Sequence, residues 1–354
     1  MSFGVEKTVS LRNYNALALD ATADYFCRLG SLDDVHQALA FARANKLTIT
    51  ALGGGSNVVL KNTIHGLVAL VELRGIRHRC VGDDVYVTIG AGEDWSSLVA
   101  LSLRNHWYGL ENLALIPGSV GAAPIQNIGA YGVELCDCFV SLQAIHTATG
   151  ELHEMDAKDC EFGYRESIFK RRERNNYVIT EVCIKLSTQP NNRWHYPALR
   201  DALEAKLEAK LEVKLGEASA VQVTPQLIAE TVADIRRTKL PDPARLPNAG
   251  SFFKNPLLDQ QQLARLMVDE PQIPVYPAYN NLSKVPAAWL IERCGLRGYR
   301  AGEVGVHERQ ALVLINYGSG SAAELLALCE HIQSAVEQRF GVCLEVEPRI
   351  YGSF

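Results

Sequence analysis

The chain has 354 residues and a mass of 38.9 kDa, with 47% apolar and 21% charged residues. This composition excludes a disordered chain, a collagen-like fibre and a disulfide-dense miniprotein. The net charge of −5 argues against a broadly basic surface for binding nucleic acid. Because a single hydrophobic core stops growing at roughly 250–300 residues, we expect two or three domains.

No stretch approaches the ~20 apolar residues of a membrane-spanning helix, and the first residues lack the pattern of a signal peptide. We therefore expect no membrane insertion. The nine cysteines are odd in number and irregularly spaced, which predicts free thiols in a reducing cytoplasm. Cys136 and Cys138 form the only close pair. No second pair lies at zinc-ligand spacing, so we predict buried structural thiols and no metal site.

Hydrophobic periodicity predicts helices and strands in mixed order. The elements expected in the first half are a helix over 31–46, strands at 47–52, 67–73 and 85–89, an apolar stretch at 58–60, a helix at 95–105, and strands near 141–146, 151–155 and 177–186. Those expected in the second half are a loop over 188–197, helices near 225–237, 258–267, 287–294 and 322–339, and strands near 310–315 and 343–350. Such a mixture predicts an α+β protein.

Residues 203–215 form a low-complexity tract with a period of four, LEAKLEAKLEVKL. On a helix this period stacks the leucines in a slowly drifting stripe and places like-charged glutamates four residues apart. We interpret the tract as a surface helix. A solvated insertion is favoured over a helix that binds a partner.

Two glycine-rich segments are candidates for binding a ligand. In GGGSN, Gly53 to Asn57, the missing Cβ atoms allow backbone N–H groups to approach a diphosphate. The segment is neither a Rossmann fingerprint nor a Walker A motif. PGSVGAAP follows at Pro117–Pro124, about sixty residues later. Two such loops favour one extended dinucleotide site over two independent turns.

Three other segments carry groups that can do chemistry. Ser251 in NAGSFFKNP lacks the nucleophile-elbow pattern, so it is either a capping or loop serine or a proton donor. Arg165 follows a tyrosine and can bind a carboxylate bidentately or form a surface ion pair. Glu345, Glu347 and Arg349 share one face of the strand predicted at 343–350. That face is either catalytic or solvated.

Taken together, these segments resemble the UDP-N-acetylenolpyruvoylglucosamine reductase family, also called UDP-N-acetylmuramate dehydrogenase, nearly end to end. The strings that carry the resemblance are GGGSN, IPGSVGAAPIQNIGAYGVEL, CEFGYRESIFK, RRTKLPDP, NAGSFFKNP, AAWLIERCGLRG, VHERQALVLIN and LEVEPR. Segments 194–197 and 274–277 resemble the longer type of the family, in which a tyrosine closes over the substrate. The chain departs from the family pattern in the 203–215 insertion and at Pro348, where valine is common.

The resemblance implies a vanillyl-alcohol-oxidase/PCMH-type FAD-binding fold with a C-terminal α+β substrate-binding domain. The implied domains are 12–190 for FAD (subdomains about 1–70 and 71–190), a connecting segment 191–240, a substrate domain 241–342 and a terminal strand 343–354. FAD is expected to bind non-covalently, NADPH to be the co-substrate, and the enzyme to be a cytoplasmic monomer.

The implied reaction reduces UDP-N-acetylglucosamine enolpyruvate to UDP-N-acetylmuramate for peptidoglycan precursor synthesis. Hydride passes from N5 of the reduced flavin to C3, and a proton from Ser251 reaches C2. Arg165 and Glu347 stabilise the charge that develops on the carboxylate, Glu347 while protonated. The implied substrate-binding residues are Tyr196, Lys239, Asn255, Tyr276 and Gln310. The expected cofactor-binding residues are Gly53, Gly54, Gly55, Ser56, Asn57, Pro117, Gly118, Ser119, Gly121, Ala122, Arg236 and Arg349. Tyr164 and Arg297 are further candidates.

Two alternatives stay open at this point. One is an FAD-dependent sugar or alcohol oxidase of the same fold class. The other is a non-catalytic module that binds a nucleotide sugar or a flavin, against which the presence of Ser251, Arg165 and Glu347 argues.

Overall fold

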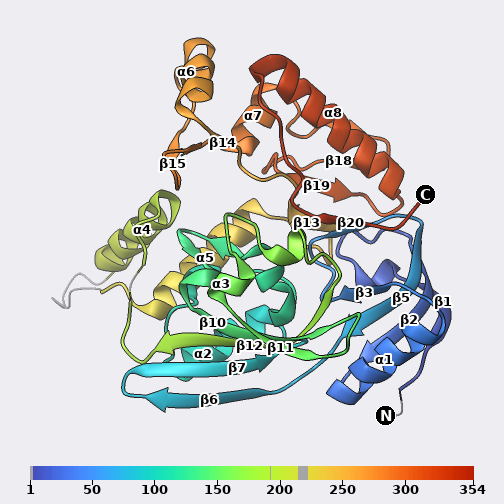
Figure 1. The fold of residues 1–354 in the computed structure, drawn as a ribbon. Coiled ribbons are helices and arrows are strands. Elements are labelled where there is room, and N and C mark those ends of the chain that lie inside the picture. The colour runs from blue at the N-terminus through green and yellow to red at the C-terminus, as the bar shows by residue number, and fades with distance from the viewer. Residues whose placement is uncertain (1–2, 192, 214–221) are drawn as a thin grey trace. The chain divides into compact units, whose positions relative to one another are not determined.

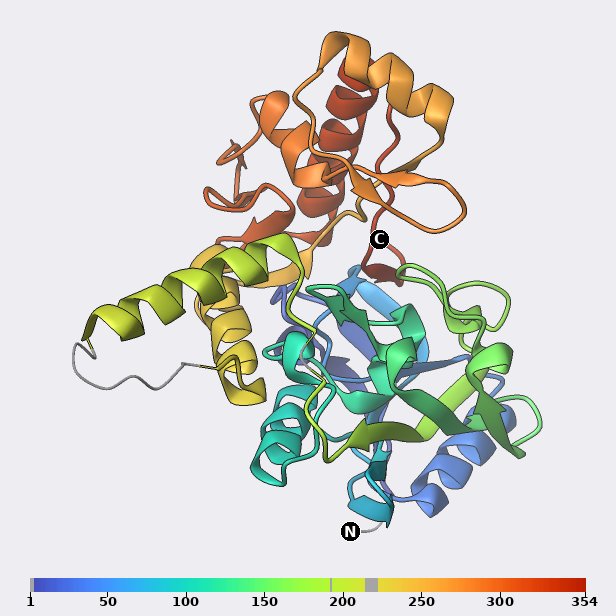
Figure 2. The same cartoon turned by 90° about the vertical axis from the view of Figure 1, so that its left-hand side faces the viewer.

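The computed structural model describes residues 3–191, 193–213 and 222–354, and its mixed helices and strands confirm the α+β class (Figures 1 and 2). The chain divides into two compact units. Unit 1 consists of Met1–Lys7, Tyr25–Gly54 and Gly66–Thr238, and unit 2 of Thr8–Asp24, Gly55–His65 and Lys239–Phe354. One boundary between the units therefore lies inside GGGSN, between Gly54 and Gly55.

A four-stranded sheet has the order β1-β2-β5-β3. Its strands are β1 (Glu6–Ser10), β2 (Thr22–Leu29), β5 (Thr63–Val71) and β3 (Ile49–Leu52), and β3 runs parallel to β5. Helix α1 (Leu32–Ala44) begins after Ser31, whose hydroxyl accepts from the backbone N–H of Asp34. Its buried Val35 and Leu39 share a core with Leu67 of β5. The edge strand β1 escaped prediction because its EKTVS sequence is largely exposed and offers no apolar face.

Unit 1 also contains a five-stranded antiparallel sheet with the order β11-β10-β12-β7-β6. The strands are β6 (Ile76–Val81), β7 (Asp84–Gly90), β10 (Phe139–His146), β11 (Leu152–Asp156) and β12 (Tyr177–Ser187). Val85, Val87 and Ile89 alternate inward from β7 into a core that they share with Trp95 and Leu98 of α2 (Trp95–Arg104). This alternation of buried and less buried residues explains why β7 could be predicted from its sequence alone.

Short elements complete unit 1. They are α3 (Ala157–Cys160), the two-residue strands β8 (Gly129–Ala130) and β9 (Val133–Glu134), and 3₁₀ turns at Glu111–Leu113, Val120–Ala122, Pro124–Gln126, Leu135–Asp137 and Ile168–Lys170.

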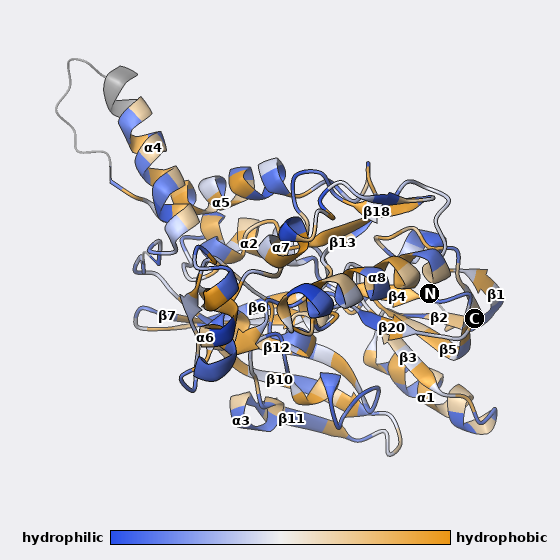
Figure 3. Cartoon of the chain, turned by 90° about the horizontal axis from the view of Figure 1, so that it is seen from above, coloured by the Kyte–Doolittle hydropathy of each residue, from blue (hydrophilic) through white to orange (hydrophobic). Residues whose placement is uncertain are grey.

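The tract with the four-residue repeat is helical but not simply solvated. Helix α4 (Pro197–Val213) covers it up to Val213, and residues 214–215 of the prediction lie outside the described residues. Leu203 is fully buried and Leu207 packs partly against the core of unit 1. Lys206 Nζ bonds Asp234 Oδ2 of α5 (Pro225–Lys239) at 2.6 Å, which lowers the pKa of Asp234. Figure 3 shows apolar and polar residues interleaved along α4. The interpretation as a solvated insertion is therefore wrong for the turn that carries Leu203, because this part of the leucine stripe packs against the core of unit 1.

Leu203→Ala should destabilise the protein by about 2–4 kcal/mol, because a fully buried leucine leaves both lost apolar contact and a cavity. Urea denaturation measures the change. The exposed Glu208→Ala on the same helix is the control and should alter the free energy of unfolding by less than ~0.5 kcal/mol. Equal effects of the two substitutions would contradict the burial of this stripe.

Unit 2 is built on a second antiparallel sheet, with the order β13-β19-β18-β17. The strands are β13 (Asn248–Ser251), β19 (Val313–Asn316), β18 (Val304–Val306) and β17 (Arg300–Ala301). Val306 and Leu314 face a core that contains residues of α7 (Ala287–Arg293) and α8 (Ala322–Phe340). Helix α8 begins with a capping box between Ser321 and Glu324 and ends at Gly341, whose φ is 65°.

The rest of unit 2 consists of small elements. A three-stranded sheet has the order β14 (Leu257–Leu258), β16 (Ser283–Lys284), β15 (Tyr276–Pro277). Helix α6 spans Gln260–Asp269, and a 3₁₀ turn spans Arg12–Tyr14. β20 (Arg349–Tyr351) pairs in parallel with β4 (Val58–Leu60).

The strand predicted at 343–350 is wrong for most of its length. Only Arg349–Tyr351 form a strand, and Val346 makes an isolated bridge to Phe253. Glu347 N donates to the Phe252 carbonyl, whereas Arg349 N donates to the Asn57 carbonyl, so the chain changes its pairing partner between the bridge and β20. The prediction that Glu345, Glu347 and Arg349 share one strand face therefore loses its basis.

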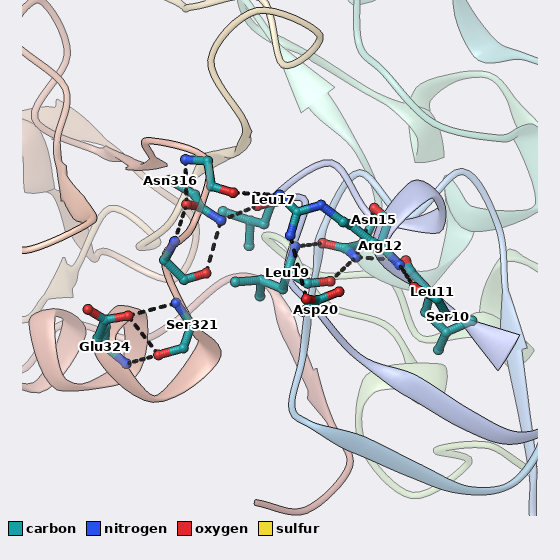
Figure 4. Close-up of polar contacts among 12 residues, drawn as sticks. Ser10, Leu11, Arg12, Asn15, Leu17, Leu19, Asp20, Asn316, Ser321 and Glu324 are labelled. Carbon is teal, nitrogen blue, oxygen red and sulfur yellow. Dashed lines mark hydrogen bonds and ion pairs between the residues drawn. The ribbon is translucent and has the colours of Figure 1, made fainter. Parts of the chain in front are cut away.

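A buried amide holds together segments of unit 2 that are far apart in sequence (Figure 4). The side chain of Asn316 is completely buried, and its Oδ1 accepts from the N–H groups of Gly318 and Gly320 at 2.9 and 2.8 Å. Its Nδ2 donates to the carbonyls of Leu17 and Gly320 at 2.9 and 3.1 Å. Asn15 binds the backbone of Leu11 and Leu19 in a similar way, which fixes the loop that carries Leu17.

Candidate functional site

The structure places the two glycine-rich segments against each other within unit 1. A Cβ added at Gly53 would lie 2.3 Å from Ser119 Oγ, and one at Gly54 would lie 3.0 Å from Gly118 Cα. Both distances are shorter than ordinary van der Waals contact. Glycine at these positions is thus explained by the close approach of the second loop.

Ser119 offers an unsatisfied group at this junction. Its Oγ is buried and has no hydrogen-bond partner among the residues that the structure describes. A buried hydroxyl without a partner costs about 1–3 kcal/mol, so a polar ligand is expected to contact it. The N–H groups of Val120 and Gly121 already donate to the carbonyls of Glu93 and Ala91 at 2.8 Å. These two N–H groups are therefore already occupied, and a Cβ at Gly121 would lie 2.5 Å from that of Ala91.

The end of GGGSN is held separately, in unit 2. Gly55 has a φ of 62°, and a Cβ there would lie 2.0 Å from the carbonyl oxygen of Tyr14. The Gly55 carbonyl accepts from Ala16 N at 3.0 Å, and the Asn57 carbonyl accepts from Arg349 N at 3.1 Å. Glycine at position 55 is needed for both its positive φ and its close contact.

The double substitution Gly53→Ala with Ser119→Ala should bind FAD, the cofactor that the sequence resemblance implies, more tightly than Gly53→Ala alone. The single variant forces the new methyl group against Ser119 Oγ, and the second substitution removes that atom. FAD affinity is measured by titrating apoprotein and following flavin fluorescence, with Ser119→Ala alone as the reference. If the second substitution gave no rescue, the clash would not lie between these two side chains.

Arg165 is held in a fixed position in unit 1. It has a φ of 54°, its side chain is only 18% exposed, and its guanidinium donates to the carbonyls of Gly129 and Asn127. Glu134 lies 3.7 Å from it. A guanidinium whose position is fixed in this way loses little further side-chain entropy when it binds an anion.

Asn127, which sequence reasoning missed, organises this position. Its side chain is fully buried, and its Nδ2 donates to Glu134 Oε2 at 2.9 Å and to the Gly163 carbonyl at 3.1 Å. Its φ of 44° is one that asparagine tolerates better than most residues. The sequence feature that could have drawn attention to Asn127 is its place in IQNIG, two residues before Gly129.

Arg236 of α5 supplies a second buried cation in unit 1. Its Nε is buried and, within the described part of the chain, has no hydrogen-bond partner. Burial lowers the pKa of Arg236; the neighbouring Tyr131 opposes this effect, and the positive charge of Arg165 adds to it. Tyr131 stacks edge-on with Tyr196, the ring centroids being 5.7 Å apart. The structure therefore brings Arg165, Arg236 and Tyr196 into one neighbourhood, which suits an anionic ligand.

Ser251 and Glu347 lie on two backbone segments that pair in unit 2. Ser251 ends β13 opposite Val313, and the carbonyl of the next residue, Phe252, accepts from Glu347 N at 2.9 Å. Lys254, 6% exposed, forms an ion pair with Glu345 at 2.5 Å. Of the two glutamates near the end of the chain, Glu345 therefore neutralises a buried lysine, and Glu347 lies opposite Phe252, the residue after Ser251.

The remaining predicted residues lie in unit 2, except Tyr164, which lies in unit 1. Asn255 Oδ1 accepts from Ala287 N at 2.9 Å at the start of α7, which leaves its amide nitrogen as the donor for a ligand. Gln310 Oε1 accepts from Leu312 N at 3.4 Å. Tyr276 lies in β15, and Lys239 is the exposed last residue of α5. Arg297 forms an ion pair with Glu292 at 3.8 Å, and Tyr164 lies beneath the guanidinium of Arg165.

A separate cavity of about 320 Å³ lies in unit 1, and its lining includes none of the predicted site residues. Glu111 lines it, 4% exposed, and burial raises the pKa of its carboxyl group. All nine cysteines are free, and no group of three or more potential ligands for a metal ion occurs within residues 3–191, 193–213 and 222–354. No helix in those ranges is both long and apolar enough to cross a membrane.

Comparison with known proteins relates both parts of the chain to one family. Residues 242–351 match the family described as UDP-N-acetylenolpyruvoylglucosamine reductase, C-terminal domain, and residues 23–156 match the FAD binding domain. The UDP-N-acetylenolpyruvoylglucosamine reductase of Paraburkholderia phymatum is 47% identical over 339 residues, which cover 96% of this chain and 95% of that one. The chain belongs to the UDP-N-acetylenolpyruvoylglucosamine reductase family. A second family member, from Chromobacterium violaceum, is 42% identical, with coverage of 99% of this chain and 100% of the other.

Solved structures confirm the fold class expected for the family. The crystal structure of the Thermus caldophilus reductase has a TM-score of 0.67 at 21% identity and covers 99% of this chain and 100% of its own. 6-Hydroxy-D-nicotine oxidase from Arthrobacter nicotinovorans has a TM-score of 0.52 at 14% identity, with 97% and 87% coverage. Together with the FAD-binding domain, these likenesses establish the vanillyl-alcohol-oxidase/PCMH-type fold.

Proposed function

We infer that this chain is the FAD-dependent reductase that converts UDP-N-acetylglucosamine enolpyruvate to UDP-N-acetylmuramate, a step of peptidoglycan precursor synthesis. The observation that carries this conclusion is 47% identity to a reductase of that name over 96% of the chain. The match of residues 23–156 to an FAD binding domain supports FAD as its cofactor. An oxidase function is not favoured, because the likeness to an oxidase is one of fold at 14% identity.

The residues of the glycine-rich loops fit FAD. The close approach of Gly53 and Gly54 to Gly118 and Ser119 forms a backbone cradle, and the unpartnered hydroxyl of Ser119 provides a donor for a phosphate oxygen. When bound, FAD supplies the hydride for the reduction of the enolpyruvyl group, after it has received electrons from a nicotinamide cofactor. We propose Gly53 to Asn57 and Pro117 to Ser119 as residues that hold it, and Arg236 and Arg349 as further cofactor-binding residues.

The chemistry that this chain's own side chains contribute is charge stabilisation and proton delivery. We propose that Ser251 donates the proton to C2 of the substrate. Arg165, whose position is fixed by the carbonyls of Gly129 and Asn127, binds the substrate carboxylate as negative charge builds on it. Glu347, whose backbone N–H donates to the Phe252 carbonyl, is proposed to donate a side-chain hydrogen bond to the same charge while protonated.

Finer features are part of this proposal. NADPH is the proposed electron donor, and Tyr196, Lys239, Asn255, Tyr276 and Gln310 are the proposed contacts to the nucleotide sugar. We also propose that the chain is of the longer type of the family, in which Tyr276 closes over the substrate. A monomeric state and the domain limits given above are part of the same proposal. The nine free cysteines support a reducing compartment, for which we propose the cytoplasm.

An anaerobic titration tests the proposed function. One equivalent of NADPH is added to the purified holoenzyme, the flavin absorbance near roughly 450 nm is followed, and enolpyruvyl-UDP-N-acetylglucosamine is then added. Bleaching followed by recovery is the expected result. Bleaching without recovery would contradict the substrate assignment and favour an oxidase. A folded protein that binds FAD but reacts with neither compound would be a binding module.

A further inference from the structure

His307 lies in the same row of the unit 2 sheet as Ser251. The pairing of β18 with β19 aligns Val306 with Leu314, and His307 N continues it by donating to the Val313 carbonyl at 2.9 Å. On its other side, Val313 pairs with Ser251 of β13. His307, Val313 and Ser251 are therefore neighbours across three strands.

These three side chains share one face of the sheet. Residues directly opposite each other on adjacent strands point to the same face, and successive residues along a strand alternate. Val306 and Leu314 point into the core with α7 and α8. The next pair along, His307 and Val313, therefore points to the opposite face, together with Ser251.

The imidazole of His307 is buried with one nitrogen that makes no hydrogen bond within the described residues. The residue is only 7% exposed, and its Nδ1 is buried without a hydrogen-bond partner anywhere in the described ranges. Burial lowers the pKa of His307, and the positive charge of Arg309 adds to this effect while Glu308 opposes it. The ring is therefore neutral near pH 7, with one nitrogen as donor and the other as acceptor.

The sheet geometry excludes Ser251 as that partner. Two strand spacings of ~4.8 Å put the two backbones roughly 10 Å apart, and Val313 stands between them on the same face. What can reach both residues is a ligand that extends along the row. Gln310, three residues after His307 and a proposed substrate contact, lies in the same connection between β18 and β19.

We propose that His307 is a specificity-determining residue whose Nδ1 hydrogen-bonds a neutral polar group, a hydroxyl or an amide, of the nucleotide-sugar substrate. This inference rests on the proposed function and adds a residue to its substrate site. A neutral imidazole suits a hydroxyl or an amide better than the diphosphate, for which a cation is the stronger partner. The buried Nδ1 without a partner then lowers the stability of the free protein, and in return the site favours a ligand that hydrogen-bonds this atom.

Two variants test this role in the oxidised holoenzyme, in which the substrate binds without turnover. His307→Leu removes every hydrogen bond, whereas His307→Asn keeps a polar atom close to the position of Nδ1. The dissociation constant of enolpyruvyl-UDP-N-acetylglucosamine is measured from its perturbation of the flavin absorbance. His307→Leu should raise this constant about 10-fold, and His307→Asn should stay within about 3-fold of the natural protein.

Thermal stability without substrate separates this role from a structural one. His307→Leu should leave the melting temperature unchanged or raise it, because it removes a buried polar group that has no partner. A Leu variant that binds substrate as tightly as the natural protein, or that melts at a lower temperature or fails to fold, would overturn the inference. A natural protein that binds FAD but does not respond to this substrate would overturn the proposed function, and this inference with it.

Discussion

Ser251→Ala should retain the reduction of the bound flavin by NADPH and lose most of its reoxidation by the enolpyruvyl substrate. The expected loss is on the order of 10²–10⁴-fold, the usual contribution of a positioned general acid. The physical reason is that the substrate needs a proton at C2 only in the second half-reaction, and that alanine removes the proposed donor without changing the backbone of β13. Anaerobic stopped-flow measurement of each half-reaction provides the test.

The matched control is Ser319→Ala, also in unit 2. Its hydroxyl is exposed and donates to Glu303 at 3.0 Å, so both half-reactions should keep their rates. Equal slowing of both half-reactions in Ser251→Ala would point to disturbed flavin binding rather than lost proton transfer. Unchanged rates in both would remove Ser251 from the mechanism and leave Glu347, its neighbour through the Phe252 carbonyl, as the side chain to test next.

The fold was predictable for elements with a regular apolar face and clear ends, but not for all elements with buried residues, since strand β2 was not predicted. Helix α1 and strand β7 have regular periodicity and a cap or turn at their ends, and both were placed within a few residues. Strand β1 is mostly exposed, and β17 and β18 are too short to show a period, so none of these was found. The strand predicted at 343–350 was too long because the segment pairs first with Phe253 and then with β4, a change of partner that periodicity does not register.

The sequence motifs of the candidate site could be found from the sequence, but the contacts that their residues make could not. The glycines of GGGSN indicate close approach, but the sequence does not say what approaches; the structure shows Gly118 and Ser119 beside Gly53 and Gly54. Arg165 was singled out from its sequence, whereas Asn127, which fixes its surroundings, looked like an ordinary loop residue. Residues that act by holding others in place have no composition signal of their own, since their partners are distant in sequence.

Asn316→Leu should destabilise unit 2 by about 3–5 kcal/mol, the largest effect on stability that we expect from a single substitution here. Leucine has a similar size but cannot hydrogen-bond. It therefore leaves the N–H groups of Gly318 and Gly320 and the carbonyls of Leu17 and Gly320 without their present partner. Urea denaturation followed by circular dichroism measures the loss. Asn45→Ala, which removes one exposed side-chain bond to the Phe41 carbonyl, is the control and should cost less than ~1 kcal/mol.

Asn316→Asp separates the two halves of this network. A carboxylate keeps the acceptor for the two glycine N–H groups but faces the Leu17 and Gly320 carbonyls with a second acceptor, and it carries a charge where the asparagine is completely buried. Burial favours the neutral carboxyl group, so its pKa in the folded protein should lie above that in the unfolded chain. The stability lost in Asn316→Asp should therefore be greatest near pH 7 and should shrink as the pH falls and the folded protein takes up the proton. The loss in Asn316→Leu has no titrating group and should not follow pH in this way. A penalty that is the same for both variants at every pH would mean that the side chain of Asn316 acts by its shape, and that the four hydrogen bonds in Figure 4 contribute little to holding the loop of Leu17 against the turn at Gly318.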